Sequence, residues 1–172
     1  RGIAALPYAM LAAQTLAQDA GPRLAALRIG GWDSARDQGA TDGFLAQRLA
    51  LIGGMLAAIK QEMGEAWKDT AIIVAGWTGR SVTPNATRGT NICLGQTIML
   101  VGGNVAGGQF AGAWRGLGAN ALDSSGAIRP TTDLRSVLKS TLADHLRLSG
   151  GVIDRVFPAA RDRAAMAGLF RR

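Results

Sequence analysis

The sequence predicts an α/β protein in which helices are layered on a mostly parallel sheet. Two observations carry this expectation. Apolar residues recur at helical spacing in three segments, and short apolar runs lie between those segments in alternation. With 48% hydrophobic residues, the 172-residue chain has enough apolar side chains to bury a core. Only three strands are evident, so we expect short strands hidden from the pattern or a sheet completed elsewhere.

The first part of the chain predicts helix, strand and helix in turn. Residues 5–18 have the spacing of a short amphipathic helix, and residues 24–29 form an apolar run that predicts a buried strand. The clearest helical stripe covers residues 45–63. Thr41 or Asp42 is placed to cap this helix.

The second part predicts two more strands and a last clear helix. Residues 70–75 are rich in β-branched side chains and predict a central strand buried on both faces. Residues 96–101 predict a further strand that ends at a glycine pair. Leucines repeat every four residues from Leu134 to Leu146, with Thr131 or Thr132 as the expected cap.

The C-terminal end predicts less regular structure. Residues 156–158 favour a docking strand, and residues 159–172 form a basic, Ala-rich tail that we expect to be a frayed helix. No linker separates two domains, so residues 1–172 are expected to be one α/β domain or a half-domain.

Composition restricts the function classes. The net charge is +7, yet the 16 arginines are scattered singly except in the C-terminal tail, and aromatic residues make up only 5%, so nucleic-acid binding is not expected. Cys93 is the only cysteine and cannot form an internal disulfide; a structural thiol is the preferred interpretation. No apolar run approaches the ~18 residues of a membrane-spanning helix.

The loops that follow the strands contain few groups for catalysis. They supply one carboxylate, Asp33, and no imidazole, whereas a two-metal site needs several of both. The only histidine, His145, lies on the last leucine-rich helix, where a helix-end or solvent-facing position is expected. A triad of Ser81, His145 and Asp33 has no supporting spacing. The glycines from Gly102 to Gly108 favour a turn over a phosphate-binding loop.

The same loops resemble a known family. The ordered motifs are Gly30-Gly-Trp-Asp-Ser-Ala-Arg-Asp-Gln-Gly39, Gly79-Arg-Ser81, Gly89-Thr90, Val101-Gly-Gly103, Gly107-Gly108, Thr131-Thr-Asp-Leu-Arg-Ser-Val137 and Val156-Phe-Pro158. They resemble the C-terminal half of the domain-of-unknown-function 1501 family, sulfatase-like bacterial proteins of the alkaline phosphatase superfamily. The resemblance implies the C-terminal part of that layered fold. It also implies a periplasmic or exported protein, because members typically leave the cell by the twin-arginine route.

The sequence departs from the family at the positions that the resemblance assigns to metal binding. The family usually reads Gly-Gly-Trp-Asp-Thr-His, Glu-Phe-Gly-Arg-Thr and Gly-Thr-Asp-His-Gly. This chain has Ala35 for the first histidine, Trp77 for the glutamate, and Asn91 and Ile92 for the last Asp-His pair. Ala, Trp and Ile cannot bind a cation, so only Asp33 remains as a plausible ligand and no cofactor is expected.

These departures predict a catalytically inactive sulfatase-like protein, a structural or interaction subunit of an exported assembly, with Trp77 and Ile92 filling the former metal cavity. A protein partner or an absent N-terminal half would cover the unpaired sheet edge. A peripheral membrane assembly is compatible with this hypothesis. The alternative is a divalent-metal hydrolase of phosphate or sulfate esters, completed by that absent half and using Asp33. A third hypothesis, binding of an anionic polymer, rests on charge alone.

Three further residues match family positions. Arg80, Asp133 and Arg135 are candidates for bracing the site. Their alternative interpretation is a loop-bracing or helix-capping ion pair, which is common at helix starts.

Overall fold

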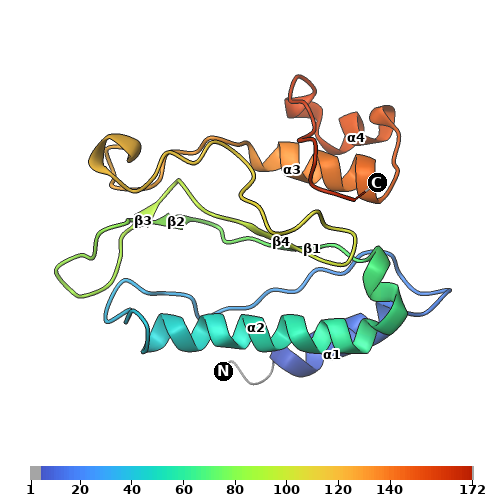
Figure 1. Cartoon of the computed structure of the whole chain (residues 1–172), viewed down its shortest axis with the longest axis horizontal. Helices are drawn as coiled ribbons and strands as arrows, with labels where there is room; N and C mark the ends of the chain where they lie inside the picture. Colours follow the sequence, from blue (N-terminus) through green and yellow to red (C-terminus); the bar gives the residue numbers. More distant parts are fainter. Residues whose placement is uncertain (1–4, 172) are drawn as a thin grey trace. The chain divides into compact units, whose positions relative to one another are not determined.

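The computed structural model describes residues 5–171 and divides into two compact units (Figure 1). Unit 1 comprises the chain up to Trp67 together with Ser81–Ile92. Unit 2 comprises Lys68–Arg80 and the chain from Cys93 onward. Among residues 5–171, none of the helices has both the length and the apolar composition of a membrane-spanning segment.

Two helices form the core of unit 1, and both were expected from the periodicity. α1 (Ala5–Leu16) packs on α2 (Phe44–Met63). The small Ala9 and Ala13 of α1 are fully buried, which lets the two helices approach closely. On α2 the buried side chains are Ile52, Met55 and Met63. A 3-10 turn, η1 (Gly64–Asp69), follows α2 directly.

The N-terminus of α2 differs from the expectation. Its N-cap is Gly43, which makes no side-chain capping hydrogen bond, so the prediction of Thr41 or Asp42 as cap is wrong. Gly43 has φ 90°, a backbone conformation that only glycine adopts without strain. The entry of the chain into the helix therefore requires glycine at the position where a side-chain cap would otherwise be placed.

The predicted buried strand at 24–29 is also wrong. In the described chain this segment pairs with no strand, and Figure 1 draws it as an irregular tube. Leu24 and Leu27 are 70% and 44% exposed. The apolar run is present in the sequence, but unit 1 provides neither a neighbouring strand nor a layer to bury it.

Unit 2 contains the other two predicted strands. β1 (Ile72–Val74) pairs antiparallel with β4 (Met99–Val101), in the register Ile72↔Val101 and Val74↔Met99. β1 is half-buried, so the prediction of a central strand buried on both faces is wrong. Two short strands that the pattern did not reveal, β2 (Gly79–Arg80) and β3 (Ile92–Cys93), pair with each other where the chain passes between the units.

The predicted mostly parallel sheet therefore stays a prediction. The described strands form two two-stranded sheets, and the β1–β4 pair is antiparallel. A layered α/β fold needs more strands than these.

The last helical region is broken into several pieces. α3 (Leu134–Ser140) continues as a π-helical turn, η3 (Thr141–His145), and α4 (Gly150–Val156) follows. Short 3-10 turns lie at η2 (Ala119–Ala121) and η4 (Pro158–Ala160). The N-cap of α3 is Asp133, so the predicted caps Thr131 and Thr132 are wrong.

The C-terminal segment is part of the core of unit 2. Leu169 and Phe170 are buried and pack with Val105 and Val137. The buried ammonium of Lys139 donates hydrogen bonds to the carbonyl oxygens of Ala160 and Arg163, at 2.5 and 2.8 Å. The expectations of a docking strand at 156–158 and of a frayed helix beyond it are therefore wrong. Val156 is the last residue of α4, and Pro158–Ala160 form the 3-10 turn η4. The chain after this turn is held by packing and hydrogen bonds.

Candidate functional site

The candidate site in unit 1 is formed by two segments far apart in the sequence. Residues 33–38 lie beside residues 81–91, and we call these two segments the Asn85 cluster. Their backbones are joined by hydrogen bonds from Thr90 N to Ser34 O, from Asp37 N to Thr87 O and from Gln38 N to Arg88 O, each 3.0 Å long. The pairing holds the loop after the apolar run 24–29 against the loop that precedes β3.

Asn85 organises the cluster. Its Nδ2 donates to the carbonyl oxygen of Ala35 and to Oδ1 of Asn91, at 3.1 Å in both cases. Its Oδ1 accepts hydrogen bonds from the amides of Thr87 and Gly89, at 3.0 Å each. One side chain therefore satisfies polar groups of both segments, which fixes the loop in a single conformation.

Glycine is required at one point of closest approach in the cluster. A Cβ atom at Gly89 would lie 2.2 Å from the carbonyl carbon of Ala35, a separation that no side chain tolerates. The neighbouring Arg88 has φ 56° and forms an ion pair with Asp37, which itself has φ 43°. Two non-glycine residues in the left-handed region within one cluster show that tertiary contacts override local backbone preference.

Three of the predicted site residues come together in this cluster. Asp33 Oδ1 accepts a hydrogen bond from the backbone amide of Ala35 at 3.0 Å, and Asn91 is joined to Ala35 through Asn85. At these positions, the carboxylate of Asp33 and the amide oxygen of Asn91 are the oxygen atoms that could act as ligands to a cation. Among the described residues, no group of three His, Cys, Asp or Glu side chains is placed to hold a metal ion.

The other two predicted positions lie outside the cluster's interior. Trp77 is 90% exposed, on a bend before β2, and Ile92 is 66% exposed on β3. The prediction that these two side chains fill a former metal cavity is therefore wrong. On β3 the alternation of a strand explains the outcome, because Cys93 points inward and Ile92 outward.

Asn85 was missed as a site residue. In the sequence it appears only as the first residue of Asn85-Ala-Thr87, a formal glycosylation sequon. The useful signal was local: an Asn followed by Thr and Gly two and four residues later is typical of a loop built on side-chain-to-backbone hydrogen bonds. Its amide group is fully engaged inside the cluster, so the structural role explains the residue.

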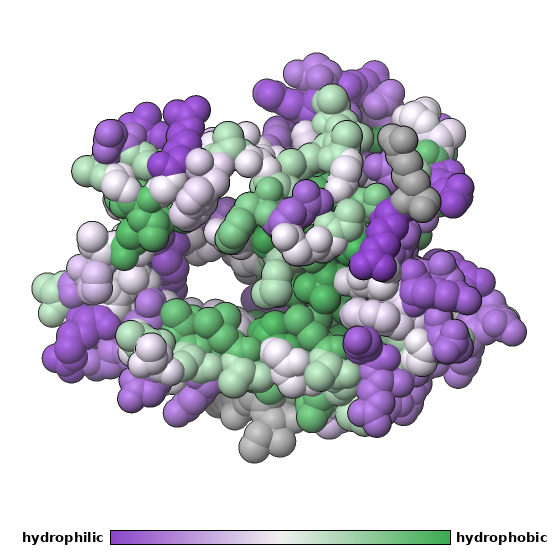
Figure 2. Space-filling view, in the orientation of Figure 1, coloured by the Kyte–Doolittle hydropathy of each residue, from purple (hydrophilic) through white to green (hydrophobic). Residues whose placement is uncertain are grey.

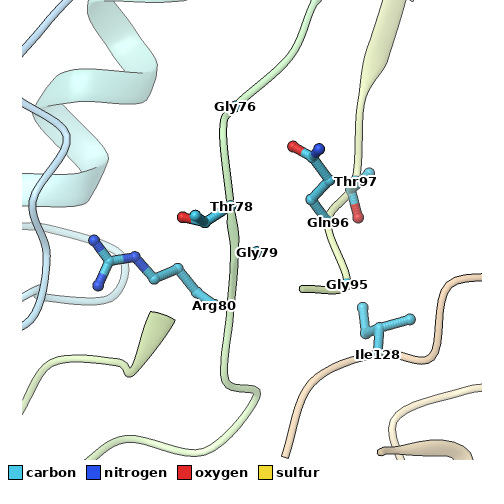
Figure 3. Close-up of a pocket in the computed structure, with 8 residues that line it drawn as sticks. All are labelled: Gly76, Thr78, Gly79, Arg80, Gly95, Gln96, Thr97 and Ile128. Carbon is cyan, nitrogen blue, oxygen red and sulfur yellow. The ribbon is translucent and has the colours of Figure 1, made fainter. Parts of the chain in front are cut away.

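Unit 2 has a pocket of its own beside β2, with a volume of about 290 Å³ (Figure 3). Part of its wall is bare backbone, because a Cβ atom at Gly79 would lie 1.5 Å from the carbonyl oxygen of Gly95. In Figure 3 the side chain of Arg80 extends away from Gly95 and Gln96. The pocket therefore presents backbone groups and the polar side chains of two threonines and Gln96, with Arg80 as its one charged lining residue. Its lining residues are Gly76, Thr78, Gly79, Arg80, Gly95, Gln96, Thr97 and Ile128.

Asp133 and Arg135 form a helix-capping pair at the start of α3, as their alternative interpretation held. Asp133 Oδ1 accepts from the backbone amide of Arg135 at 2.9 Å, and Oδ2 accepts from the guanidinium Nη2 at 2.6 Å. The hydrogen bonds from Arg135 lower the pKa of Asp133 to about 2. Arg163 lies at 3.9 Å from the same carboxylate.

His145 and Cys93 are both more enclosed than a surface position would make them. His145 ends the π-helical turn η3, as expected for a helix-end residue, but the solvent-facing interpretation is wrong because its ring stacks on Phe170 at 5.4 Å. Cys93 is buried, and its Sγ lies 3.5 Å from the carbonyl oxygen of Ser125. The structural-thiol interpretation of Cys93 agrees with this burial.

A family model described as "Protein of unknown function (DUF1501)" matches residues 8–170, almost the whole chain. The chain belongs to the DUF1501 family. No curated protein and no solved structure matches it. The match confirms the family that the ordered loop motifs indicated.

Membership of DUF1501 assigns no activity, so the role of this DUF1501 protein must be inferred from its own residues. The Asn85 cluster gathers two oxygen-bearing side chains, Asp33 and Asn91, around a rigid hydrogen-bonded loop. Trp77 and Ile92 present apolar surface to solvent. The chain thus combines a hydrogen-bonded loop scaffold and a large exposed apolar area with few side chains that could bind a cation or catalyse a reaction.

Proposed function

We propose that this chain is a catalytically inactive, sulfatase-like structural or interaction subunit that packs against another polypeptide in an exported bacterial assembly. On this proposal the chain supplies the C-terminal part of a layered α/β fold of the alkaline phosphatase superfamily. The observation that carries the proposal is the apolar segment 24–29, which has the composition of a buried strand and lies exposed without a strand partner.

On this proposal, segment 24–29 becomes a strand at a sheet edge only when a partner pairs with it. Full burial of an exposed leucine side chain contributes about 1.5–3 kcal/mol, and Leu24 and Leu27, 70% and 44% exposed, realise only part of this gain in the chain alone. Natural proteins protect such edges by covering or pairing them. A strand from another polypeptide, or from the rest of a longer protein, is the complementary partner.

The total surface area supports the same conclusion. The chain exposes 11,554 Å². A monomer of this mass is expected to expose roughly 8,000 Å², and two separate domains of half the mass together about 9,600 Å². The excess is about 2,000 Å² even for two independent units. Figure 2 shows apolar side chains gathered over α2, and fourteen large hydrophobic residues are exposed among the described residues.

The residues at the former ligand positions support a non-catalytic role. Ala35, Trp77 and Ile92 carry no group that binds a cation, and Asn91 offers a neutral amide oxygen. We therefore expect no resident metal or other cofactor. The rigid Asn85 cluster shows that the loop scaffold is fully built, since its polar groups are hydrogen-bonded and its closest approach is made at a glycine.

The superfamily, the periplasmic or exported location and export by the twin-arginine route rest on the resemblance of the loop motifs. The scattered arginines and few aromatic residues still favour a protein partner over nucleic acid. Attachment to a peripheral membrane assembly is compatible with the proposal.

One observation favours a second candidate, a metal-dependent hydrolase of phosphate or sulfate esters. Asp33 and Asn91 are joined through the Asn85 cluster, and the Trp77 and Ile92 side chains are both exposed. Ligands from another polypeptide would complete a divalent-cation site beside Asp33. This candidate predicts ester hydrolysis in the assembled protein only.

The decisive experiment places a photoreactive amino acid at Leu27, in the exposed segment, in the protein produced in its bacterial source. We expect cross-linking to one defined polypeptide. The same group at Lys60, an exposed polar position of α2 in the same unit, is the matched control and should not cross-link. Ala26→Pro, which removes a backbone donor from the segment, should abolish the cross-link at Leu27 without unfolding the chain.

A folded chain that cross-links equally at Leu27 and Lys60, or at neither, would overturn the proposal. The purified assembly should also be assayed for bound metal by elemental mass spectrometry and for hydrolysis of p-nitrophenyl phosphate and sulfate. Hydrolysis that Asp33→Asn abolishes would establish the second candidate in place of the first.

A further inference from the structure

The single histidine of the chain lies where the C-terminal segment meets the rest of unit 2. His145 ends the π-helical turn η3, in which the amide of Leu146 donates to the carbonyl oxygen of Thr141, five residues earlier, at 3.0 Å. A π-helical turn widens the helix and redirects the side chains that follow, and such turns are frequent at functional sites. Here the imidazole contacts Asn104 and Phe170.

The contacts of the ring fit its neutral form. Asn104 Nδ2 lies 3.1 Å from Nδ1 of His145, so an amide that donates there requires an Nδ1 without a proton. One face of the imidazole ring is in apolar surroundings, because the Phe170 ring stacks on it with an interplanar angle of 21°. With the amide in this orientation, a proton added at Nδ1 would place donor against donor, and Asn104 would have to turn its Oδ1 toward the ring to accept it.

Both partners of the ring belong to the attachment of the C-terminal segment. The backbone oxygen of Asn104 accepts from the amide of Arg171 at 2.9 Å, and the amide of Ala106 donates to the carbonyl oxygen of Leu169 at 2.9 Å. Val105 and Phe170 form an isolated antiparallel bridge, and both are buried in the core of unit 2. The imidazole therefore lies at the end of a short two-stranded pairing between residues 104–106 and 169–171.

The charged surroundings act in opposite directions. Burial lowers the pKa of His145, and the carboxylate of Asp69, from η1, opposes this with a smaller effect. Asp144 and Arg147 flank the ring along its own segment, and Arg171 follows Phe170 on the C-terminal segment. Loss of solvation by the imidazolium is the largest contribution, so the folded state disfavours the proton.

We propose that His145 is a pH-operated latch for the C-terminal segment: the neutral ring holds residues 169–171 against Asn104 and Val105, and protonation releases them. When the segment is open, the pKa of His145 is that of an ordinary histidine, about 6.5. When the segment is closed, the pKa of His145 is lower. The closed state is therefore fully favoured above pH 6.5 and loses stability as the pH falls below it. Release would expose Leu169 and Phe170, the apolar residues that the latch keeps buried.

The test combines an NMR titration with amide hydrogen exchange on the 172-residue chain. Because the chain has one histidine, its ring resonance reports His145 without ambiguity. We expect a pKa below 6.5. Between pH 7.5 and 5.0, the protection of the Ala106 and Arg171 amides, corrected for intrinsic exchange, should fall by about tenfold per unit of pKa difference between the two states. Amides inside α2 are the internal control and should not change.

Two variants make the latch falsifiable. His145→Gln keeps an acceptor for Asn104 but cannot titrate, so protection should become independent of pH. Asn104→Asp places a carboxylate at the ring, which should raise the pKa of His145 and reverse the pH dependence. A pKa of His145 at or above 6.5, or the same loss of protection in His145→Gln, would overturn the proposal.

Discussion

Single side chains hold the irregular parts of this chain in place. Asn85 joins two loops of unit 1 through five side-chain hydrogen bonds to backbone and side-chain groups, and Asp133 joins a helix start to a guanidinium in unit 2. Loops have few apolar contacts to define them, so one well-placed polar side chain decides their conformation. The consequences of changing these residues follow from the atoms they leave unpaired.

Asn85→Ala is expected to destabilise unit 1 by about 2–3 kcal/mol, since it removes hydrogen bonds to the Ala35 carbonyl and to the Thr87 and Gly89 amides. Asn85→Asp is the matched comparison, because it retains the acceptor but not the donor and should cost less. Urea denaturation measures both. Equal stability of Asn85→Ala and the wild type would show that the cluster is not held by this side chain.

Asp133 predicts an acid-dependent contribution to the stability of unit 2. Its pKa is about 2 in the folded chain against an ordinary value of 3.8, so the contribution is fully present above about pH 4 and is lost as the pH falls toward 2. Asp133→Asn keeps a good N-cap but loses the charge, so it should abolish this pH dependence and lower the stability near neutrality to what the wild type retains once its carboxylate is protonated. Asp133→Ala removes the cap as well, for a loss of about 1 kcal/mol. Thermal unfolding at pH 2.5, 4 and 7 separates the two effects.

At the scale of elements, sequence periodicity predicted those that pack on something within the chain. The helices at 5–18 and 45–63 and the strands at 70–75 and 96–101 are all present, although shorter than the patterns suggested, except for the second helix. Residues 24–29 have an equally good strand pattern and form none, because a strand exists only through its partner. The two-residue strands β2 and β3 are too short to leave any periodic signal.

The helix caps and the candidate site also depend on tertiary partners that a local sequence pattern does not show. Thr131 and Thr132 are good capping residues, yet Asp133 caps α3 because Arg135 fixes its carboxylate. Sequence reasoning selected Asp33, Ala35 and Asn91, which do come together, but it could not find Asn85, whose role depends on a loop fifty residues away. It also placed Trp77 in an interior that this chain does not form.

α2 offers a direct test of whether its outer face is free. Gly53 and Gly54 lie in the middle of the helix, and a Cβ atom at either would meet nothing within 4 Å. Gly53→Ala and Gly54→Ala should therefore each stabilise the isolated chain by about 0.5–1 kcal/mol, through the helix propensity of alanine. Gly89→Ala is the opposite control and should destabilise it strongly. Thermal unfolding gives the sign; a loss of stability at Gly53 or Gly54 would mean that this face is covered in solution.

At the scale of the whole molecule, charge and apolar surface are distributed differently. Unit 2 carries 12 Lys and Arg against 6 Asp and Glu, a net charge of +6, whereas unit 1 carries 7 against 6. The exposed apolar segment 24–29 belongs to the nearly neutral unit 1. Like charges oppose contacts between copies of unit 2, so unit 1 is the part of the chain most able to associate.

The isolated chain should therefore self-associate through unit 1, and more strongly in high salt, where the repulsion between copies is screened. Sedimentation velocity at 0.05 and 0.5 M NaCl measures this association, and binding of an apolar dye reports the exposed surface. Leu24→Ser together with Leu27→Ser should reduce both signals at least several-fold, whereas Lys60→Ser, in the same unit, should leave them unchanged. A wild-type chain that stays monomeric at high concentration in both salts and binds no dye would show that its apolar surface needs no partner. The scaffold proposal would then lose the observation that carries it, because an edge that water tolerates does not call for a second polypeptide.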